Sequence, residues 1–123
     1  MSINIGVIMS VISFSENGEH IWHAAGWAFR QVLDDVSRQY AADHEIVEKC
    51  ERAKMYSGLI VYLFDPALAA RIKAAIKNVA TGIREGTISS GITQQPYGDA
   101  VTIEQYLNSL GELLRILHTS DSS

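Results

Sequence analysis

The sequence predicts a mainly α-helical protein, a compact bundle of about four helices with one N-terminal β-strand. Three observations predict this fold class. Apolar residues recur at spacings of three and four over most of the chain, as they do along the buried face of an amphipathic helix. Residues that start and end helices separate these segments. Hydrophobic residues make up 47% of the 123 residues and two are proline, which suits one core-forming domain and excludes a disordered chain.

The first element is expected to be a strand. Residues 3–14 carry apolar, often β-branched side chains on both alternating faces, which favours a strand buried on both sides over a helix. A turn at residues 15–18 follows. Residues 19–40 then have a helical period, and we expect one helix there with this core-facing set: Ile21, Trp22, Ala25, Phe29, Val32, Leu33, Val36 and Tyr40.

The second helix is expected at residues 43–64. Asp43 is a favourable N-cap residue, and an apolar stripe with alternating spacings of four and three continues from Ile46 to Phe64. Part of this range, residues 58–64, is also compatible with a buried strand, because periodicity cannot separate the two structures in so short an apolar run. A second strand there would make the fold α+β.

The third helix is expected at residues 66–85, with Asp65 as its N-cap, a proline at its first position and Gly86 as its C-cap. Residues 87–101 that follow are rich in Gly and polar side chains, and so long a connection without regular structure is unusual in a small domain. The segment is therefore either a functional loop or, in the α+β alternative, contains a short strand near residues 87–93.

The last helix is expected at residues 102–118, where Thr102 and Gln105 fit a capping box, and residues 119–123 should form a frayed tail. No repeat or change in composition divides the chain, so residues 1–123 are expected to form a single domain. The N-terminal strand needs a partner edge. The 87–101 segment could supply one, or a second copy of the chain could do so in a homodimer.

Charge and composition exclude several functional classes. Ten basic and fourteen acidic side chains give a net charge of −4, which argues against a nucleic-acid-binding protein. The apolar run of residues 3–14 is too short to span a bilayer and lacks the flanks of a secretory signal. One cysteine cannot form an internal disulfide, which agrees with a cytoplasmic location. The basic residues of the third helix are interpreted as a solvated face or as a complement to the acidic second helix.

No motif for catalysis or for a cofactor is present. The glycines lack the spacing of a phosphate-binding loop, and no Gly-x-Ser-x-Gly turn occurs. Cys50 lies within the apolar stripe of the second predicted helix, so we interpret it as a buried structural thiol and not as a nucleophile. We therefore expect no cofactor, no metal and no enzymatic activity.

One face of the predicted helix 19–40 has an unusual composition. Opposite the core stripe, a polar face would normally carry Lys and Glu, whereas this one carries Trp, His and Arg within roughly 80° of arc at 100° per residue. Trp and Arg are enriched at binding hot spots. The predicted partner-binding residues are His20, His23, Trp27, Arg30, Asp34 and Asp35. The competing interpretation is that Trp27 is covered by other segments and belongs to the core.

These observations favour a non-enzymatic protein-binding domain. Within that class, a toxin-neutralising protein of the immunity or antitoxin kind fits the small size and acidic charge. It would occlude a partner with a basic surface, which acidic residues steer into place. The alternative is a small-molecule or metal-binding helical domain, which could be an enzyme. That site would use His20, His23 and the 87–101 loop with its Tyr97.

Overall fold

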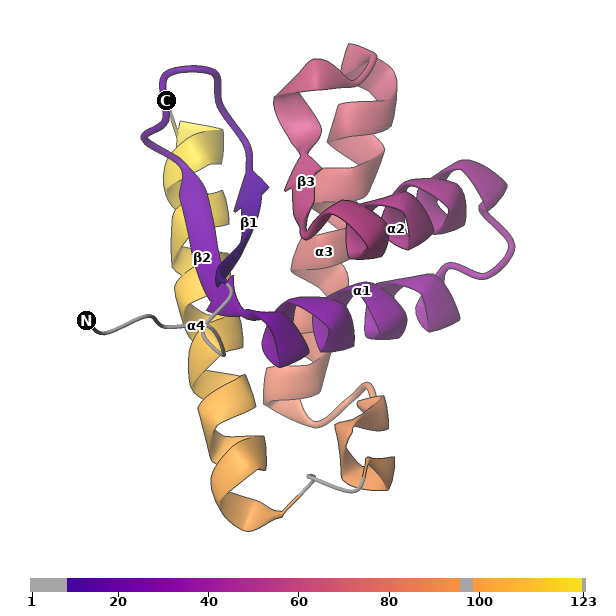
Figure 1. The fold of residues 1–123 in the computed structure, drawn as a ribbon, viewed down its shortest axis with the longest axis vertical. Coiled ribbons are helices and arrows are strands. Elements are labelled where there is room, and N and C mark those ends of the chain that lie inside the picture. The colour runs from indigo at the N-terminus through magenta and orange to yellow at the C-terminus, as the bar shows by residue number, and fades with distance from the viewer. Residues whose placement is uncertain (1–8, 96–98, 123) are drawn as a thin grey trace, which may run out of the picture.

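A computed structural model describes residues 9–95 and 99–122 of the chain. The described elements are four α-helices, a small sheet and two short 3-10 helices, so the predicted mainly α fold is confirmed, with an α+β feature (Figure 1). In chain order they are β1 (Met9–Ser13), β2 (Ile21–Ala25), α1 (Gly26–Gln39), α2 (His44–Tyr56), β3 (Gly58–Ile60), η1 (Val61–Leu63), α3 (Pro66–Glu85), η2 (Gly91–Gln94) and α4 (Ala100–Ser122).

The sheet has the strand order β2-β1-β3, with β1 antiparallel to β2 and parallel to β3. Ile12 lies opposite Trp22 on one side and Leu59 on the other, and all three side chains are buried. Met9 and His23, on the other face of the sheet, are exposed. The sheet thus turns one face to the core, as its period of two requires.

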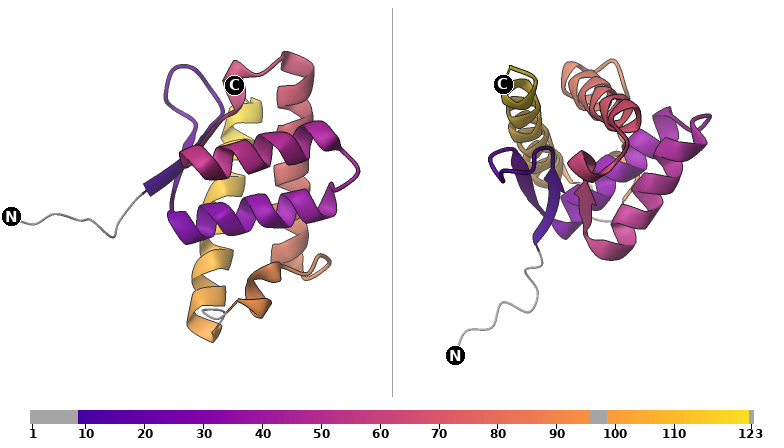
Figure 2. Two further views of the ribbon diagram at one scale, coloured as in Figure 1. Left: turned by 45° about the vertical axis from the view of Figure 1, so that its right-hand side comes forward. Right: turned by 90° about the horizontal axis from the view of Figure 1, so that it is seen from above.

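The helices form two layers. α3 and α4 pack against each other along their length, while α1 and α2 lie side by side and cross α3 (Figures 1 and 2). β2 closes the remaining side next to α4, where Trp22 Nε1 donates a hydrogen bond to the Ser109 carbonyl at 3.0 Å. The largest side chains in the core are Trp22, Tyr106, Phe29, Ile12, Leu33, Ile46, Ile72, Ile76, Ile92, Leu110, Leu113 and Leu117.

The predicted helix 19–40 is wrong over its first seven residues. Residues 21–25 form β2, and α1 begins only at Gly26. Gly18, at φ +78°, makes the turn that returns the chain, and Phe14 N–H then donates to the His20 carbonyl at 2.9 Å. The apolar residues of this segment fit the period of a helix as well as that of a strand. Pairing with β1 therefore decides that the segment is a strand. The predicted strand 3–14 is observed as β1, and its residues 3–8 lie outside the described part of the chain.

The predicted helix 43–64 is also too long. Asp43 caps α2 as expected, accepting from the Ile46 N–H at 3.3 Å, but the helix ends at Tyr56. Ser57 adopts a left-handed conformation with φ 57°, which stops the helix and redirects the chain. The alternative of a second strand within residues 58–64 is confirmed for Gly58–Ile60, after which η1 follows.

The short strand considered near residues 87–93 is wrong, because the chain forms η2 there. Ser90 caps η2 through its hydroxyl, which accepts from the Ile92 N–H at 3.1 Å. α3 begins and ends as predicted, with the Asp65 carboxylate accepting from the Ala67 N–H at 3.1 Å and Gly86 at φ +81°.

The last helix is longer than the predicted 102–118, since α4 covers Ala100–Ser122. Its N-terminal cap is Asp99, whose carboxylate accepts from the Thr102 N–H at 2.8 Å. The sequence pattern predicts Thr102 as the cap of a capping box with Gln105. That prediction is wrong, because Asp99 takes the cap position.

Candidate protein-binding surface

The predicted partner-binding residues do not share a helical face. His20 lies before β2 and is buried, with its Nδ1 hydrogen-bonded to Ser15 Oγ at 2.9 Å. His23 is exposed on β2, whereas Trp27 and Arg30 lie on α1. These residues would share one face only if a helix began at residue 19. Because residues 21–25 form a strand, the two histidines do not lie on α1.

Trp27 is half-buried and packs against the core. Its ring lies 6.3 Å from that of Tyr106, tilted by 48°, a separation and angle typical of attractive aromatic pairs. The interpretation of Trp27 as part of the core therefore has direct support from its contacts. Arg30, one turn further along α1, is exposed.

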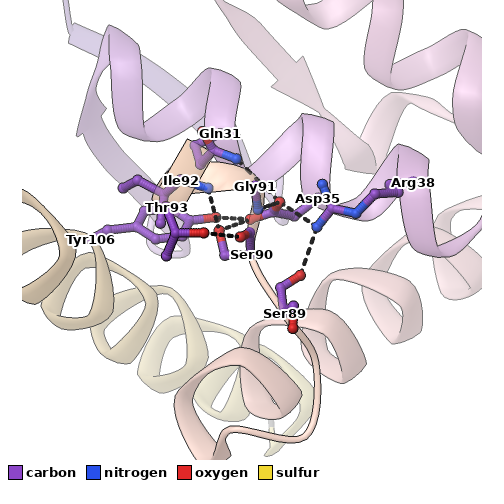
Figure 3. Close-up of polar contacts among 9 residues, drawn as sticks. All are labelled: Gln31, Asp35, Arg38, Ser89, Ser90, Gly91, Ile92, Thr93 and Tyr106. Atoms are coloured by element: carbon purple, nitrogen blue, oxygen red, sulfur yellow. Dashed lines mark hydrogen bonds and ion pairs between the residues drawn. The ribbon is translucent and has the colours of Figure 1, made fainter. Parts of the chain in front are cut away.

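Asp35 is the most buried of the predicted site residues, with none of its surface exposed. Five donors surround its carboxylate (Figure 3). Oδ1 accepts from Gln31 Nε2 at 3.1 Å, Arg38 Nη2 at 2.8 Å and the Gly91 N–H at 2.9 Å, and Oδ2 accepts from Ser90 Oγ at 2.6 Å and Tyr106 Oη at 2.8 Å.

This network joins α1 to the segment before η2 and to α4. Burial, together with the negative charge of Asp35, raises the pKa of Tyr106, so its hydroxyl remains a donor. Arg38 also donates to the Ser89 carbonyl at 2.7 Å. A carboxylate so enclosed cannot steer a partner. Asp35 is a structural tie that fixes the 87–95 segment.

The neighbouring Asp34 is engaged in an ion pair within the chain. Lys54 Nζ lies 2.7 Å from Asp34 Oδ1 and 2.9 Å from Glu51 Oε1, which links α1 to α2. Burial tends to lower the pKa of Lys54, but its hydrogen bonds to Asp34 and Glu51 outweigh this and raise it. Both acids are thus paired with one cation of the same chain.

The acidic start of α2 is balanced by a cation of α3. Arg71 lies 2.6 Å from Asp43 Oδ2 and 2.9 Å from Glu45 Oε1. The hydrogen bond from Arg71 lowers the pKa of Asp43. The interpretation of the basic third helix as a complement to the acidic second helix is confirmed at this residue.

Cys50 is buried in α2, as its place in the apolar stripe predicts. Burial raises the pKa of its thiol to about 11, so it is neutral at physiological pH and has no nucleophilic character.

A different surface gathers the exposed apolar side chains. Met55 and Tyr56 end α2, and Leu63 ends η1; their exposed fractions are 76%, 76% and 70%. Tyr56 and Leu63 line a hollow of about 320 Å³, which we call the α2–β3 hollow; Met55 precedes Tyr56 on α2 and is not part of the lining. Its lining is Lys49, Arg52, Ala53, Tyr56, Gly58, Leu59, Ile60, Leu63 and Phe64.

The charged residues that line this hollow are both cations. Lys49 Nζ lies 5.3 Å from the centre of the Phe64 ring and 3.8 Å from Glu48. Arg52 is exposed, and no ion pair or hydrogen bond of its side chain is found within the described part of the chain. On a protein of net charge −4, an apolar hollow with two cations is a distinct environment.

A wider hollow of about 550 Å³ lies at the connection of α1 and α2. It contains Asp43 and Glu45, both already in ion pairs with Arg71, and no large apolar side chain is exposed beside it among the described residues. The α2–β3 hollow is therefore the better candidate for a binding surface.

The sequence contained a signal for this surface. Met55, Tyr56 and Leu63 are apolar but lie off the stripe that runs from Ile46 to Phe64. In one continuous helix Tyr56 and Leu63, seven residues apart, would share a face, but no hollow would lie beside them. The end of α2 at Tyr56 and the return through β3 create the hollow that both residues line.

The alternative site of His20, His23 and Tyr97 gains no support. Tyr97 lies outside the described residues. Within residues 9–95 and 99–122, no three His, Cys, Asp or Glu side chains gather as a metal site would require. The same part of the chain contains no helix with the length and hydrophobicity needed to cross a membrane.

Similarity to known proteins does not narrow the function further. Comparison of the chain with protein-family models, with curated proteins and with solved structures finds no match.

Proposed function

We propose that this chain is a non-enzymatic protein-binding domain, and that it binds its partner through the α2–β3 hollow and acts by occluding that partner. The observation that carries the proposal is an apolar hollow lined by the exposed side chains of Tyr56 and Leu63, with Arg52 at its wall. Aromatic residues, Met and Arg are enriched at protein interfaces, and exposed apolar patches of this kind mark interaction sites.

The proposal changes the charge expected of the partner. Each acid of α1 and α2 that was expected to steer a basic partner is either buried or in an ion pair with a cation of this chain. The hollow itself presents Lys49 and Arg52. Complementarity therefore favours an acidic group on the part of the partner that enters the hollow.

A toxin-neutralising protein of the immunity or antitoxin kind remains the class we propose. Such a protein needs a stable scaffold, one specific surface and no catalytic groups. The core of this chain provides the scaffold, and the α2–β3 hollow provides a surface that the stability of the fold does not require.

The test is an affinity capture from a lysate of the native host with three immobilised proteins: the wild type, Leu63→Asp and Val101→Asp. Val101 is a matched control because it is also exposed, at 64%, and lies on α4 at the opposite end of the molecule from η1 (Figure 1). The wild type and Val101→Asp should retain one protein in similar amounts, and Leu63→Asp should retain at least tenfold less.

A second measurement addresses the class of partner. The gene of the captured protein is expressed alone and together with the wild-type chain or with Leu63→Asp. A toxin would stop growth alone, the wild type would restore it and Leu63→Asp would not. Equal capture by all three immobilised proteins, or capture of nothing specific by the wild type, contradicts the proposed surface.

A further inference from the structure

β3 is an edge strand of the sheet. It pairs on one side with β1, and no other strand of the described residues pairs with its other side. The free edge of a strand presents unpaired main-chain N–H and C=O groups, which can accept another strand.

The register tells which residues present those groups. Val11 N–H donates to the Ser57 carbonyl at 3.3 Å, and Val11 lies opposite Gly58 in the parallel ladder. In a parallel pair the residues that bond to one neighbour alternate with those that face away. Ser57 and Leu59 therefore face β1, while the N–H and C=O of Gly58 and the N–H of Ile60 point to the free edge. The Ile60 carbonyl, at the N-cap of η1, accepts the first hydrogen bond of that 3-10 helix.

The same edge borders the α2–β3 hollow. Gly58 and Ile60 line the hollow from the strand side, and Arg52 and Tyr56 line it from α2. The free main-chain groups and the apolar lining thus belong to one surface. Gly58 has no side chain to obstruct an approaching backbone there.

We infer that the partner presents an extended segment, which adds as a strand to the free edge of β3, places an apolar side chain in the hollow and an acidic side chain against Arg52 and Lys49. This inference rests on the protein-binding function proposed above and names its mode of recognition. Strand addition obtains affinity from main-chain hydrogen bonds and specificity from pockets for alternate side chains. β3 supplies the main-chain groups and the hollow supplies a pocket for a side chain. Lys49 and Arg52 in its lining favour a negatively charged side chain on the partner.

The length of β3 suits a regulated edge. With three residues, followed at once by η1, it offers too little unpaired backbone for uncontrolled pairing with other sheets. A partner must therefore add side-chain contacts in the hollow to the few hydrogen bonds that Gly58 and Ile60 can form.

The test uses a library of random 12-residue peptides displayed on phage. Peptides are selected for binding to the wild type and against binding to Leu63→Asp, and the enriched sequences are synthesised. We expect acidic sequences with alternating apolar residues and no proline at their centre. Arg52→Glu should weaken their binding at least tenfold. Arg30→Glu, the same change at an exposed arginine of α1, should leave it within twofold.

Two readouts test strand addition itself. In the complex, amide hydrogen exchange at Gly58 and Ile60 should slow at least tenfold. Two series of the peptide are N-methylated at alternate residues, one at the odd and one at the even positions. The series whose methylated N–H groups would face β3 should not bind, and the other series should bind within a few fold of the unmodified peptide.

The inference is overturned if the enriched peptides are basic, if both N-methylated series bind equally, or if Gly58 and Ile60 exchange at unchanged rates. It is also overturned if no peptide distinguishes the wild type from Leu63→Asp. In each case, the capture experiment with Leu63→Asp and Val101→Asp decides separately whether the hollow binds a protein at all. A positive capture then leaves the proposed function intact with another mode of binding.

Discussion

The donors around Asp35 come from three separate parts of the chain, and each of them would be left without this acceptor if the carboxylate were changed. Asp35 and Tyr106 are both fully buried, so water cannot replace the bond between them. A buried group deprived of its partner costs more free energy than the bond itself contributes. The network therefore concentrates much of the stability of the 87–95 segment in one side chain.

We predict that Asp35→Asn lowers the free energy of unfolding by about 3 kcal/mol, in the range found when one partner of a buried charged network is removed. The amide removes the negative charge. Its N–H groups face either the donors around Oδ1 or the hydroxyls of Ser90 and Tyr106, which then have to accept. Asp34→Asn is the matched control, because its ion pair with Lys54 is partly exposed and is worth less than about 1 kcal/mol. Urea unfolding measures both. Equal effects would show that Asp35 is not the tie described above.

Trp27 provides a second residue-scale prediction. Because its ring packs against the core and Tyr106, Trp27→Ala should cost about 2 kcal/mol, below the 3–5 kcal/mol typical of a fully buried aromatic. Arg30→Ala, on the same helix but exposed, should stay within about 0.5 kcal/mol. If Trp27→Ala instead left the unfolding midpoint unchanged and weakened partner binding, the sequence-based binding face would be restored.

The thiol of Cys50 predicts a dependence of stability on alkaline pH. Burial raises its pKa from the ordinary value of 9.0 to about 11. Between these two values the unfolded chain releases the proton and the folded chain keeps it. The contribution of this thiol to the free energy of unfolding is therefore fully present below pH 9 and is lost as pH rises toward 11.

Urea midpoints between pH 8 and 11 should show this fall in the wild type and a smaller one in Cys50→Ala. In the folded wild type, a thiol-reactive disulfide reagent at pH 8 should label Cys50 no faster than the chain unfolds. Rapid labelling without urea would mean that the thiol is accessible.

At the scale of elements, the ends of the helices were the most predictable feature. Asp43, Asp65 and Gly86 act in the structure as their residue types predict. These signals are local, since a cap depends on the geometry of a few neighbouring residues. Periodicity likewise located the buried face of α1, where Phe29, Val32, Leu33 and Val36 are buried as expected, because an amphipathic helix turns one face to the core.

The errors arose where pairing between distant segments decides the structure. Trp22 and Ala24 fit a strand and Ile21, Trp22 and Ala25 fit a helix, and only the partner strand β1 selects between them. α2 ends at Ser57, which has a left-handed backbone conformation. This conformation is uncommon for residues other than glycine, so the sequence does not signal the end of the helix. The α2–β3 hollow exists only after that turn is made, so a helical wheel could not show it.

Three glycines give an element-scale prediction: Gly82 and Gly86 at the C-terminal end of α3, and Gly111 on α4. A Cβ at Gly82 would lie 2.6 Å from Ile88 Cγ1, so Gly82→Ala should cost about 2 kcal/mol by displacing Ile88. Gly86 has open space around it but φ +81°, so Gly86→Ala should cost about 1 kcal/mol. At Gly111 the nearest atoms belong to the flexible end of Arg84, and Gly111→Ala should be neutral or stabilising.

Urea unfolding of the three single variants orders these effects. The predicted order of destabilisation is Gly82→Ala, then Gly86→Ala, then Gly111→Ala. A larger loss for Gly86→Ala than for Gly82→Ala would mean that Ile88 moves aside easily and that the positive φ dominates.

For the whole molecule, the structure separates the residues that stabilise the fold from those proposed to bind. The buried apolar side chains lie between the helices and the inner face of the sheet, and they include Ala53 and Leu59 at the α2–β3 hollow. The other lining side chains include Arg52, Tyr56 and Leu63, which are exposed. Exposed apolar side chains contribute little to stability because folding does not remove them from water. Exposed apolar side chains of this kind are expected on a surface that becomes buried in a complex.

The triple variant Met55→Gln, Tyr56→Gln and Leu63→Gln tests this separation. We expect its free energy of unfolding to stay within about 0.5 kcal/mol of the wild type, as is usual for exposed positions, because these side chains are at least 70% exposed. Binding of the captured partner should weaken more than tenfold, since hot spots are central apolar and aromatic residues. Val101→Gln, at an exposed residue of α4, should change neither quantity. Urea unfolding and titration calorimetry on the same samples measure both, and a loss of stability above about 2 kcal/mol in the triple variant would assign these residues to the fold and not to a binding surface.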